Sequence, residues 1–546
     1  MKWNIEEQPI FFPKKIRKIY EKIYTANRLS YTNWIDKITE PQKKNIDWWM
    51  TKPTLRNPYT SNLLNYITVL ETLEKIKEKN LKIITSSFEI KDVLNKYFNK
   101  KFNLKINVKK NIYNFFKSKI FYLFKVFIFQ LFIFSYVKIF IRKKVYNNKL
   151  KYTFIDTFIT LNKELNEGFY PAMPDRNNEK TLFVPTIIHT LKLTKLIKSI
   201  KKINKKNYLF KEHYLTFGDL FFSFFHFYRK LKFLKNSYSY KKYNLSKIVN
   251  EEIISLDNYN SAVVGILNYK FFKNISNFLT VVKSVNWFEN QVIDRGWNLG
   301  FRTFFKKYEK NSFGYQNFTR HYNLISFSPS ISENKSKVTP EKIIIISKYF
   351  HKITKEFYKK QISILGPTNR FKNMQMNRAK NFKYKTNILL ILSGIFEIDK
   401  ALVKIVREAC LINKKIKVFV KDHPIMPLKK IISSKDIPTN FIITNENLNK
   451  LLKKSLISIT SGPTSAVQES YNMNNFIILP DIEVGTKINA LRLKLNLKKT
   501  FIVENKEQLS KKINFIKKNK NKLKKIKNKS TKFFEVINKK NVQIFY

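Results

Sequence analysis

The chain has 546 residues, and its 105 lysines and arginines outnumber its 39 aspartates and glutamates, giving a formal net charge of +66. Apolar residues make up 43% of the sequence and aromatic residues 15%, which excludes a disordered polyelectrolyte. The single cysteine, Cys410, excludes an intramolecular disulfide and any site built from several thiolates. At about 100 to 200 residues per domain, the length predicts two or three domains.

The ten glycines form neither a dinucleotide-binding fingerprint nor a Walker A loop, which excludes P-loop NTPases and classical NAD enzymes. The lysines accompany many Asn, Ile, Phe and Tyr residues, which AT-rich codons encode, so much of the charge can reflect base composition. The charge still favours anionic partners, either nucleic acid or an anionic membrane surface. Because no recognised DNA- or RNA-binding motif is present, we expect no nucleic-acid partner, and a basic nucleic-acid-binding protein is kept as the non-enzyme alternative.

The N-terminal part of the chain begins an alternation of helices and strands. Residues 1–8 lack the basic start and apolar core of a secretory signal, so we expect no export. Apolar spacing predicts a helix over 61–79, a short buried strand over 81–85 and a helix over 90–98. The strand predicted over 151–160 is expected to belong to the same sheet as 81–85.

An apolar run over 120–137 contains one charge, Lys125, and is bracketed by lysines and Arg142. It is long enough to cross a bilayer. A crossing would place strands 81–85 and 151–160 on opposite sides of the membrane. We therefore favour an inserted segment, 113–144, that forms an interfacial helix or helical hairpin with its lysines on anionic headgroups, and a buried core helix and a transmembrane span stay as alternatives. The expected location is cytoplasmic, peripheral at the inner face of the cytoplasmic membrane.

The remaining patterns predict an α/β protein with two Rossmann-like domains facing a cleft. The first domain, 1–350, is completed by a helix over 214–235 and by strands over 181–188, 262–267, 284–288 and 341–348. A polar, basic stretch predicts a linker over 351–385. Strands and helices alternate regularly in the second domain, 386–516, with strands over 387–392, 416–420, 440–443, 456–460, 475–479 and 500–503. Helices are predicted over 398–412, 427–434, 446–454 and 463–473, and a basic tail, 517–546, follows.

Two loops of the second domain carry side chains suited to an anion. The first reads KDHP at 421–424, and the second reads SGPTSAVQE at 461–469. Both follow the carboxyl ends of strands in one predicted sheet, where ligands bind in such folds. Hydroxyls, helix-terminal amides, Lys421 and His423 could therefore bind a phosphate. Alternatively, Ser461 or Thr464 caps its helix and His423 caps its own turn.

The order of these motifs resembles the nucleotide-binding half of bacterial glycosyltransferases with the two-domain glycosyltransferase-B architecture. It is most similar to capsule, O-antigen and other surface-polysaccharide transferases, including sialyltransferase types whose His-Pro and Ser/Thr-rich motifs contact the donor nucleotide. In the first domain, four stretches resemble a group of surface-carbohydrate transferases: DWWMTKPTLRNPYTS at 47–61, WFENQVIDRGWNLGF at 287–301, GYQNF at 314–318 and the stretch 329–348 with Glu333.

The resemblance implies a membrane-associated enzyme that moves a sugar from a nucleotide-sugar to a surface polysaccharide or lipid-linked glycan. A CDP-glycerol-type polyol-phosphate transferase is the alternative enzyme. No cofactor is expected besides the nucleotide-sugar substrate, and the scattered histidines predict no metal site, because basic groups can carry the leaving-group charge. The residues that the resemblance assigns to donor phosphate or ribose are Lys421, His423, Ser461, Gly462, Thr464, Ser465 and Glu469.

The resemblance does not fix a catalytic base. An inverting transferase needs a carboxylate or histidine that deprotonates the acceptor hydroxyl, and this group would come from the first domain, across the cleft from the donor. Glu289 and Asp294 are the leading candidates, because they follow a predicted buried strand among Trp, Asn, Gln and Arg residues. Alternatively, they form structural ion pairs with Arg295 or Arg302. Asp156, at the end of its strand, is the next candidate.

Overall fold

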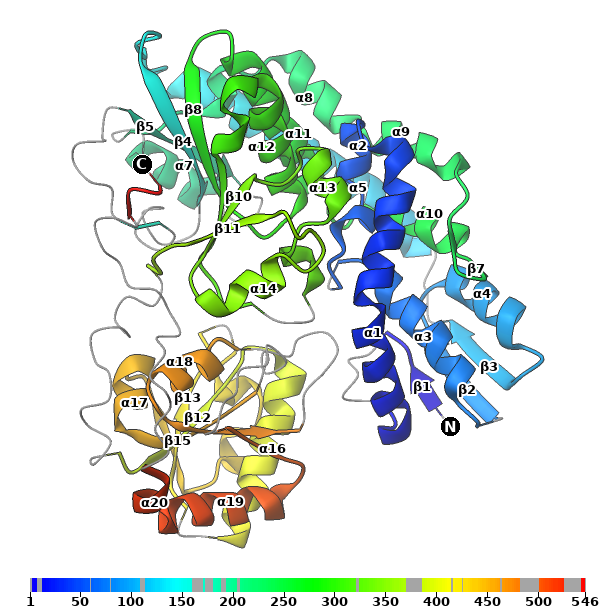
Figure 1. Ribbon diagram of the computed structural model, residues 1–546, viewed down its shortest axis with the longest axis vertical. Coiled ribbons are helices and arrows are strands. Elements are labelled where there is room, and N and C mark those ends of the chain that lie inside the picture. The colour runs from blue at the N-terminus through cyan, green and yellow to red at the C-terminus, as the bar shows by residue number, and fades with distance from the viewer. Residues whose placement is uncertain are drawn as a thin grey trace.

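The structure, a computed structural model, describes residues 2–6, 12–58, 60–78, 80–108, 113–159, 170–171, 180–187, 193–203, 207–320, 324–369, 385–413, 416–424, 426–461, 464–481, 500–524 and 542–545. Two six-stranded parallel sheets lie in the two halves of the chain, and a three-stranded parallel sheet lies near the N-terminus (Figure 1). The predicted α/β fold with two Rossmann-like domains facing a cleft is confirmed. A short antiparallel hairpin, β6 (Ser239–Tyr240) and β7 (Tyr243–Asn244), completes the strands.

The C-terminal sheet has the strand order β14-β13-β12-β15-β16-β17. This is the Rossmann order, in which the chain reverses its direction of progress between β12 and β15. The short strands are apolar and buried, as expected where helices cover both faces of a parallel sheet. The strands are β12 (Asn387–Ile391), β13 (Val418–Lys421), β14 (Phe441–Thr444), β15 (Ser455–Thr460), β16 (Phe476–Pro480) and β17 (Thr500–Val503).

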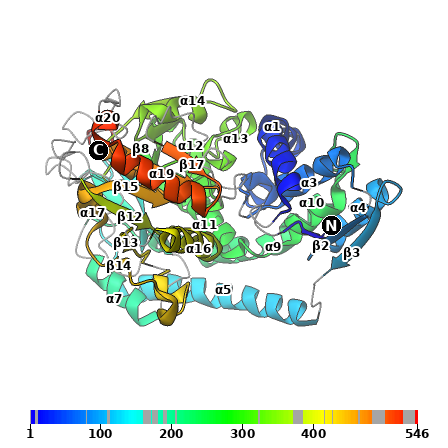
Figure 2. The ribbon, with the colours of Figure 1, turned by 90° about the horizontal axis from the view of Figure 1, so that it is seen from below.

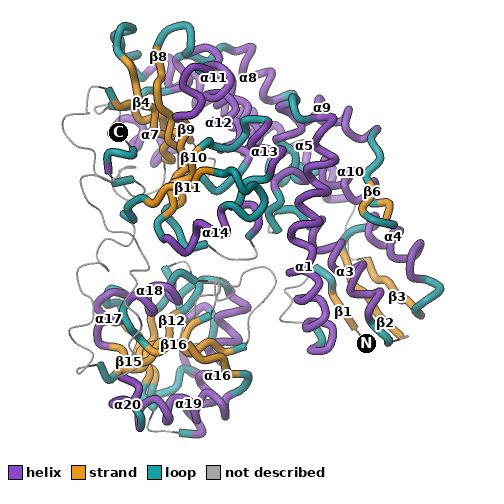
Figure 3. Tube along the Cα trace, viewed as in Figure 1, coloured by secondary structure: helices purple, strands orange, loops and turns teal. Residues whose placement is uncertain are grey.

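The helices of this half lie around the sheet (Figure 3). They are α16 (Phe396–Ile412), α17 (Leu448–Lys454), α18 (Ala466–Asn472), α19 (Lys506–Lys518) and α20 (Lys520–Lys524). The predicted strands of this half are all present, with boundaries that differ by at most two residues. The helix expected over 427–434 is wrong, since this segment forms two short 3-10 turns, Leu428–Lys430 and Ser434–Asp436.

The first six-stranded sheet has the order β11-β10-β9-β8-β4-β5. Its strands are β4 (Lys151–Ile159), β5 (Thr181–Ile187), β8 (Thr280–Trp287), β9 (Ser312–Gln316), β10 (Lys342–Ile345) and β11 (Ile362–Leu365). Residues 341–348 were expected to close this domain, but β11 pairs with β10 beyond them, so the sheet extends into the segment expected to be the linker. Residues 370–384 of that linker lie outside the described residues.

Two helices that cover this sheet, α11 (Tyr259–Ile275) and α12 (Val292–Phe304), touch through their backbones. A Cβ atom on Gly296 would lie 1.7 Å from the carbonyl oxygen of Gly265. The prediction of a strand over 262–267 is therefore wrong, because this run lies within α11. Its sequence is continuously apolar because the helix is buried nearly all round. Periodicity alone does not distinguish such a buried helix from a buried strand.

The three-stranded sheet consists of β1 (Lys2–Asn4), β2 (Asn80–Thr85) and β3 (Asn103–Val108). The expectation that 81–85 and 151–160 share a sheet is wrong, because β2 pairs only with β1 and β3 among the described strands. The helices near this sheet and along its side of the molecule are α1 (Lys14–Thr39), α2 (Ile46–Trp49), α3 (Leu63–Lys75), α4 (Phe88–Phe98) and α10 (Ser246–Ile254).

A long helix, α5 (Tyr113–Phe140), leads from β3 to β4 and lies along one edge of the molecule (Figure 2). Its part Ile120–Phe140 is long and apolar enough to cross a membrane, with mean hydropathy 2.0, and 39% of its most apolar window is buried. Near its C-terminal half lie α8 (Phe217–Phe224) and the 3-10 turn Lys211–His213. The remaining helices are α7 (Leu193–Ile203), α9 (His226–Arg229), α13 (Ile331–Lys335) and α14 (His351–Thr354).

Residues 542–545 of the predicted basic tail lie away from the C-terminal sheet (Figure 1). Phe545 is fully buried, and its ring lies 4.7 Å from that of Tyr315 on β9 and 6.2 Å from that of Tyr170. The chain end therefore packs against the first six-stranded sheet.

Candidate active site

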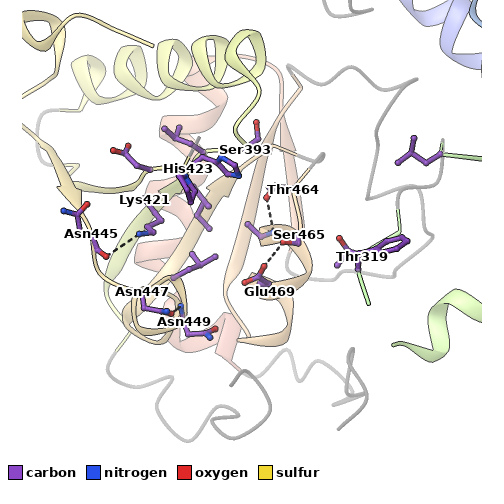
Figure 4. A pocket seen from close by; sticks show the side chains of 18 of the residues that line it. Thr319, Ser393, Lys421, His423, Asn445, Asn447, Asn449, Thr464, Ser465 and Glu469 are labelled. Atoms are coloured by element: carbon purple, nitrogen blue, oxygen red, sulfur yellow. Dashed lines mark hydrogen bonds between the residues drawn. The ribbon is translucent and has the colours of Figure 1, made fainter. Parts of the chain in front are cut away.

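A cavity of about 900 Å³ lies between the carboxyl ends of the two six-stranded sheets. Loops after β8 and β9 line it from the first half, and loops after β12, β13, β14 and β15 line it from the second (Figure 4). This volume lies within the range of small-molecule sites, about 300 to 1,000 Å³. The sequence-predicted residues that line it are Glu289, Lys421, His423, Thr464, Ser465 and Glu469.

The loop after β12 is the first segment of the C-terminal half that lines the cavity, and it lies where the strand order reverses. Ser393 lines the cavity, and the buried Asp399 carboxylate accepts hydrogen bonds from the Ser393 backbone N–H at 2.7 Å and hydroxyl at 2.8 Å. It also accepts one from the Gly394 N–H at 2.8 Å. Burial raises the pKa of Asp399, while these three donors and nearby His423 oppose the rise. Asp399 therefore fixes the turn that presents Ser393.

Gly394 lies directly beneath the imidazole of His423. Its φ angle is +85°, a conformation that side chains with a Cβ rarely adopt, and a Cβ there would lie 2.4 Å from His423 Nδ1. The two loops after β12 and β13 therefore meet at one close contact. Figure 4 shows Ser393 and His423 side by side at this end of the cavity.

Among the described residues, the cavity wall of the second half also carries the Lys421 ammonium group, hydroxyls and amides. Lys421 ends β13, and its Nζ lies 3.5 Å from the Asn445 carbonyl oxygen. Ser465 donates a hydrogen bond from Oγ to Glu469 Oε1 at 2.7 Å, and the Thr464 hydroxyl accepts one from the Ala466 N–H at 3.3 Å. Thr464 thus bonds the first backbone N–H of α18, whereas the N-cap of that helix is Ser465, which has no side-chain capping hydrogen bond.

Ser461, also expected here, is not among the described residues that line the cavity. Ser461 is fully buried, and its Oγ has no hydrogen-bond partner in the described part of the chain. Gly462 lies outside the described residues.

Glu289 is the carboxylate that the first half brings to the cavity. It follows β8, is half-buried, and accepts hydrogen bonds from Trp287 Nε1 at 2.9 Å and Gln291 Nε2 at 2.6 Å. Next to it, Asn290 has a φ angle of +59° and donates from Nδ2 to the Ser326 carbonyl oxygen at 2.8 Å. A constrained loop therefore holds Glu289, and the cavity rim beside it carries Phe318, Thr319 and Phe327.

The two other candidate bases lie away from the cavity lining. Asp294 is 3% exposed and caps α12, where its Oδ2 accepts hydrogen bonds from the backbone N–H groups of Gln291 at 3.0 Å and Glu289 at 2.9 Å. Burial raises the pKa of Asp294, and the two backbone donors oppose this rise. Asp156 is fully buried in β4, where burial raises its pKa to about 7. The alternative ion pairs of Glu289 or Asp294 with Arg295 or Arg302 are absent from the described part of the chain, where Arg295 pairs with Glu333 and Arg302 with Glu341.

Arg295 belongs instead to a buried ion cluster behind the Glu289 loop. Glu333 accepts hydrogen bonds from Arg56 Nη2 at 2.6 Å and Arg295 Nη2 at 2.7 Å, and all three side chains are almost fully buried. Asn290 Nδ2 lies 3.2 Å from Glu333 Oε1. Burial alone would raise the pKa of Glu333, but the two guanidinium groups hold it below its usual range. The motifs at 47–61 and 287–301 and the stretch at 329–348 therefore meet in one structural cluster.

The sequence did not reveal several residues that line the cavity or shape the turns beside it. Ser393, Gly394 and Asp399 follow a correctly predicted strand, and the Ser-Gly pair between a strand and a helix was the available signal. Asn445, Asn447 and Asn449 follow β14 and line the cavity, but asparagine is too common in this sequence to attract notice. In the described residues, no three His, Cys, Asp or Glu side chains form a group that could hold a metal ion.

No family model matches the chain, and no curated protein is significantly similar to it. Among solved structures, it is similar to a glycosyltransferase from Rickettsia africae, with 12% identity, coverage of 68% of this chain and 89% of that one, and a TM-score of 0.35. It is also similar to UDP-GlcNAc 2-epimerase from Neisseria meningitidis (9% identity, 69% and 94% coverage, TM-score 0.37). A third similar structure is MurG from Acinetobacter baumannii, with 9% identity, coverage of 67% of this chain and 90% of that one, and a TM-score of 0.35. These similarities are distant, and the strand order of the chain itself defines its fold.

Proposed function

We propose that the chain is a glycosyltransferase that moves a sugar from a nucleotide-sugar to a surface polysaccharide or lipid-linked glycan. One observation carries this proposal. The cavity between the two sheets has Lys421, His423 and several hydroxyl groups at the Rossmann crevice of one half, and the Glu289 carboxylate on the wall of the other. A donor with a negatively charged leaving group and an acceptor hydroxyl can therefore meet between complementary groups.

On the donor side, Lys421 and His423 would contact the phosphates. The Lys421 side chain would stabilise the charge that develops on the leaving nucleotide, a task that a fixed cation performs best where surrounding protein limits water. The hydroxyls of Ser393 and Thr464 lie on the same wall and would donate hydrogen bonds to phosphate oxygens. Glu469, held by Ser465, would accept hydrogen bonds from ribose hydroxyls.

On the acceptor side, Glu289 would act as the base of an inverting transfer. Its carboxylate accepts the proton of the acceptor hydroxyl as that oxygen bonds to the anomeric carbon, and the nucleotide leaves with the electron pair of the broken bond. Trp287 and Gln291 each bond one carboxylate oxygen, which orients the group toward a fixed position. The aromatic rings of Phe318 and Phe327, 4.8 Å apart, provide an apolar wall for a sugar face.

Calorimetry with UDP, CDP, CMP, GDP and ADP tests the donor site. At least one nucleotide should bind the full chain, and Lys421→Ala and His423→Ala should each weaken it roughly tenfold or more, the loss expected for a charge-assisted contact. Lys429→Ala is the matched control, since Lys429 is exposed in the same loop region and does not line the cavity. Folded protein that binds none of the five nucleotides would overturn the proposal.

A polyol-phosphate transferase with a CDP-glycerol donor would use the same phosphate-binding side chains. The product separates the two enzymes, because glycosyl transfer adds a sugar alone and polyol-phosphate transfer adds a phosphodiester. The acceptor glycan is incubated with the full chain and with the nucleotide-sugar that carries the nucleotide found to bind. Mass spectrometry of the glycan should then show a mass increase equal to one sugar residue. An increase that includes phosphorus would favour the alternative.

A further inference from the structure

One face of α5 and α8 exposes a row of large apolar side chains. On α5 they are two neighbouring residues, Ile120 (69% exposed) and Phe121 (72%), followed about one helical turn apart by Phe124 (62%) and Ile128 (52%). On α8 and the adjoining turn into α9 they recur every three or four residues: Phe217 (55%), Phe221 (48%), Phe225 (46%) and Tyr228 (67%). We call these eight side chains the α5–α8 surface. Soluble proteins rarely leave so many neighbouring large apolar groups in water without a partner.

Ring contacts join the two helices, and two of these contacts involve members of the surface, Phe217 and Phe221. Phe127 of α5 lies 4.7 Å from Phe224 and 5.6 Å from Phe221, and Phe134 lies 4.8 Å from Phe217. These contacts bind both helices into one unit, so their exposed rows form a single surface. None of the eight residues lines the cavity between the sheets.

The opposite face of α5 is fixed in the protein core. The side chains on it that are buried in the packed clusters are Val126, Phe129, Ile133, Phe134 and Val137. A helix that crossed a bilayer would have to withdraw these side chains from their contacts with the sheet and with α11. The structure therefore favours a helix that lies flat, with one face in protein and the other outward.

Cations cluster where α5 ends. Lys138 is exposed on its last turn, and Arg142, Lys143 and Lys144 follow it. Lys143 Nζ lies 4.8 Å from the centre of the Tyr214 ring, and a small recess here is lined by the three cations and His213, with no acidic side chain among its described lining residues. Asp219 at the start of α8 is buried and caps that helix.

We propose that the α5–α8 surface inserts into the interfacial region of an anionic lipid bilayer, with Arg142, Lys143 and Lys144 on the lipid phosphates. Apolar side chains that enter the acyl boundary and cations beside them on anionic headgroups are the two components of peripheral membrane binding. A protein partner would satisfy the apolar row as well, but the row of cations at its edge matches a negatively charged surface. The proposal stands independently of the proposed function.

Vesicle flotation with the full chain tests it. Vesicles of phosphatidylcholine mixed with phosphatidylglycerol should bind the protein, and salt should release it. Binding to vesicles of phosphatidylcholine alone should be weaker by roughly tenfold or more. Absence of binding to the anionic vesicles would overturn the proposal and favour a protein partner. Failure of alkaline carbonate to extract the bound chain would also overturn it, because a spanning helix resists such extraction.

Two matched pairs of variants locate the contact. Phe121→Ser/Phe124→Ser/Ile128→Ser should lower vesicle binding about tenfold or more, because it removes three largely exposed apolar side chains from the α5–α8 surface. The control Leu411→Ser/Ile412→Ser/Ile502→Ser changes three side chains in the C-terminal half that are equally exposed, at 67%, 54% and 63%, and should bind like the parent. Equal losses in the two variants would contradict the assigned surface.

The second pair tests the charges. Arg142→Gln/Lys143→Gln/Lys144→Gln should abolish most of the preference for anionic vesicles, since each cation at such a surface contributes about fivefold. The control Lys355→Gln/Lys359→Gln/Lys360→Gln removes three exposed cations that directly follow α14, which Figure 2 shows on the side opposite α5. An unchanged lipid preference in the first variant, or its loss in the control, would contradict the proposal.

Discussion

The Asp294 carboxylate accepts a hydrogen bond from the backbone N–H of Glu289 at 2.9 Å, so one candidate base holds the loop that carries the other. Asp294 caps α12 and is buried, whereas Glu289 reaches the cavity. The sequence alone makes both carboxylates candidates for the catalytic base, but the structure gives them different expected roles. Glu289 is the candidate that can touch an acceptor, and Asp294 is a positioning residue.

Replacing Glu289 by Gln should lower turnover about a hundredfold or more and leave nucleotide affinity nearly unchanged. The amide keeps the size of the side chain and still accepts the hydrogen bond from Trp287, but it cannot take the proton of the acceptor. Turnover and calorimetry on the same preparation provide the test. Near-parent turnover would exclude Glu289 as the base.

Replacing Asp294 by Asn should affect turnover and stability less than replacing it by Ala. Asp294→Asn keeps an oxygen that can accept both backbone hydrogen bonds, so it should lower turnover less than about tenfold. Asp294→Ala removes the cap and should destabilise the protein by about 1 kcal/mol, with a larger loss of turnover as the Glu289 loop loosens. The paired measurement is a melting curve with an activity assay. If Asp294→Asn were as inactive as Glu289→Gln, the roles assigned to the two carboxylates would be wrong.

The C-terminal half could be predicted well from sequence because each of its strands is short, apolar and bounded by a polar loop. Lys421 and His423 were found because they follow such a strand, and parallel strands bring their carboxyl ends to one edge. The helix α11 could not be predicted, because its packing against α12 on one side and the sheet on the other leaves no polar face. The Arg56–Glu333–Arg295 cluster joins residues up to 277 positions apart, so no local pattern reveals it.

Gly394→Ala should weaken nucleotide binding strongly. The new methyl group would collide with His423, and the φ angle of +85° disfavours alanine. Because the loop is at the surface of the cavity, we expect His423 to move and the fold to persist. Gly218→Ala is the matched control, since the nearest atom to its Cβ would be 3.6 Å away and its position is exposed in a helix. Circular dichroism and calorimetry measure both properties, and unchanged nucleotide affinity in Gly394→Ala would contradict the contact assigned to His423.

Asp156 should make the stability of the first six-stranded sheet depend on pH. Burial raises the pKa of Asp156 from 3.8 to about 7, so between these values the folded chain binds a proton that the unfolded chain has released. The contribution of Asp156 to the free energy of unfolding should therefore fall as pH rises from about 4 to about 7 and then level off. Asp156→Asn should reduce this fall, since a neutral amide can still accept the 2.8 Å hydrogen bond from the Thr186 hydroxyl.

Urea unfolding at a series of pH values measures this effect. Other buried groups also titrate in this interval: burial raises the pKa of Glu252 to about 7 and lowers that of His213 to about 4, with opposite effects on stability. The contribution of Asp156 is therefore the difference between the parent and Asp156→Asn profiles. Asp436→Asn, at an exposed position, is the control and should leave the parent profile unchanged. Parent and Asp156→Asn profiles that run parallel over this pH interval would contradict the neutral form of Asp156.

Glu333 should be one of the residues on which folding of the first half depends most. Its two oxygens accept hydrogen bonds from Arg56, Arg295, Asn290 and the Ser330 backbone N–H, and its carboxylate is the negative charge between two buried guanidinium groups. Removing one member of such a buried cluster leaves charge without compensation, at a cost of about 3 to 5 kcal/mol. We therefore expect Glu333→Gln to lower the urea midpoint of this half markedly.

Glu341→Gln gives the matched comparison, because Glu341 pairs with Arg302 but its side chain is 27% exposed. Arg302 also donates to the Thr339 carbonyl oxygen at 2.8 Å, so it keeps a partner when Glu341 loses its charge, and we expect a loss of about 1 kcal/mol or less. Glu333→Gln should in addition lower turnover in the fraction that still folds, because Asn290 next to Glu289 loses an acceptor. Equal destabilisation by the two substitutions would show that the buried cluster does not hold the Glu289 loop.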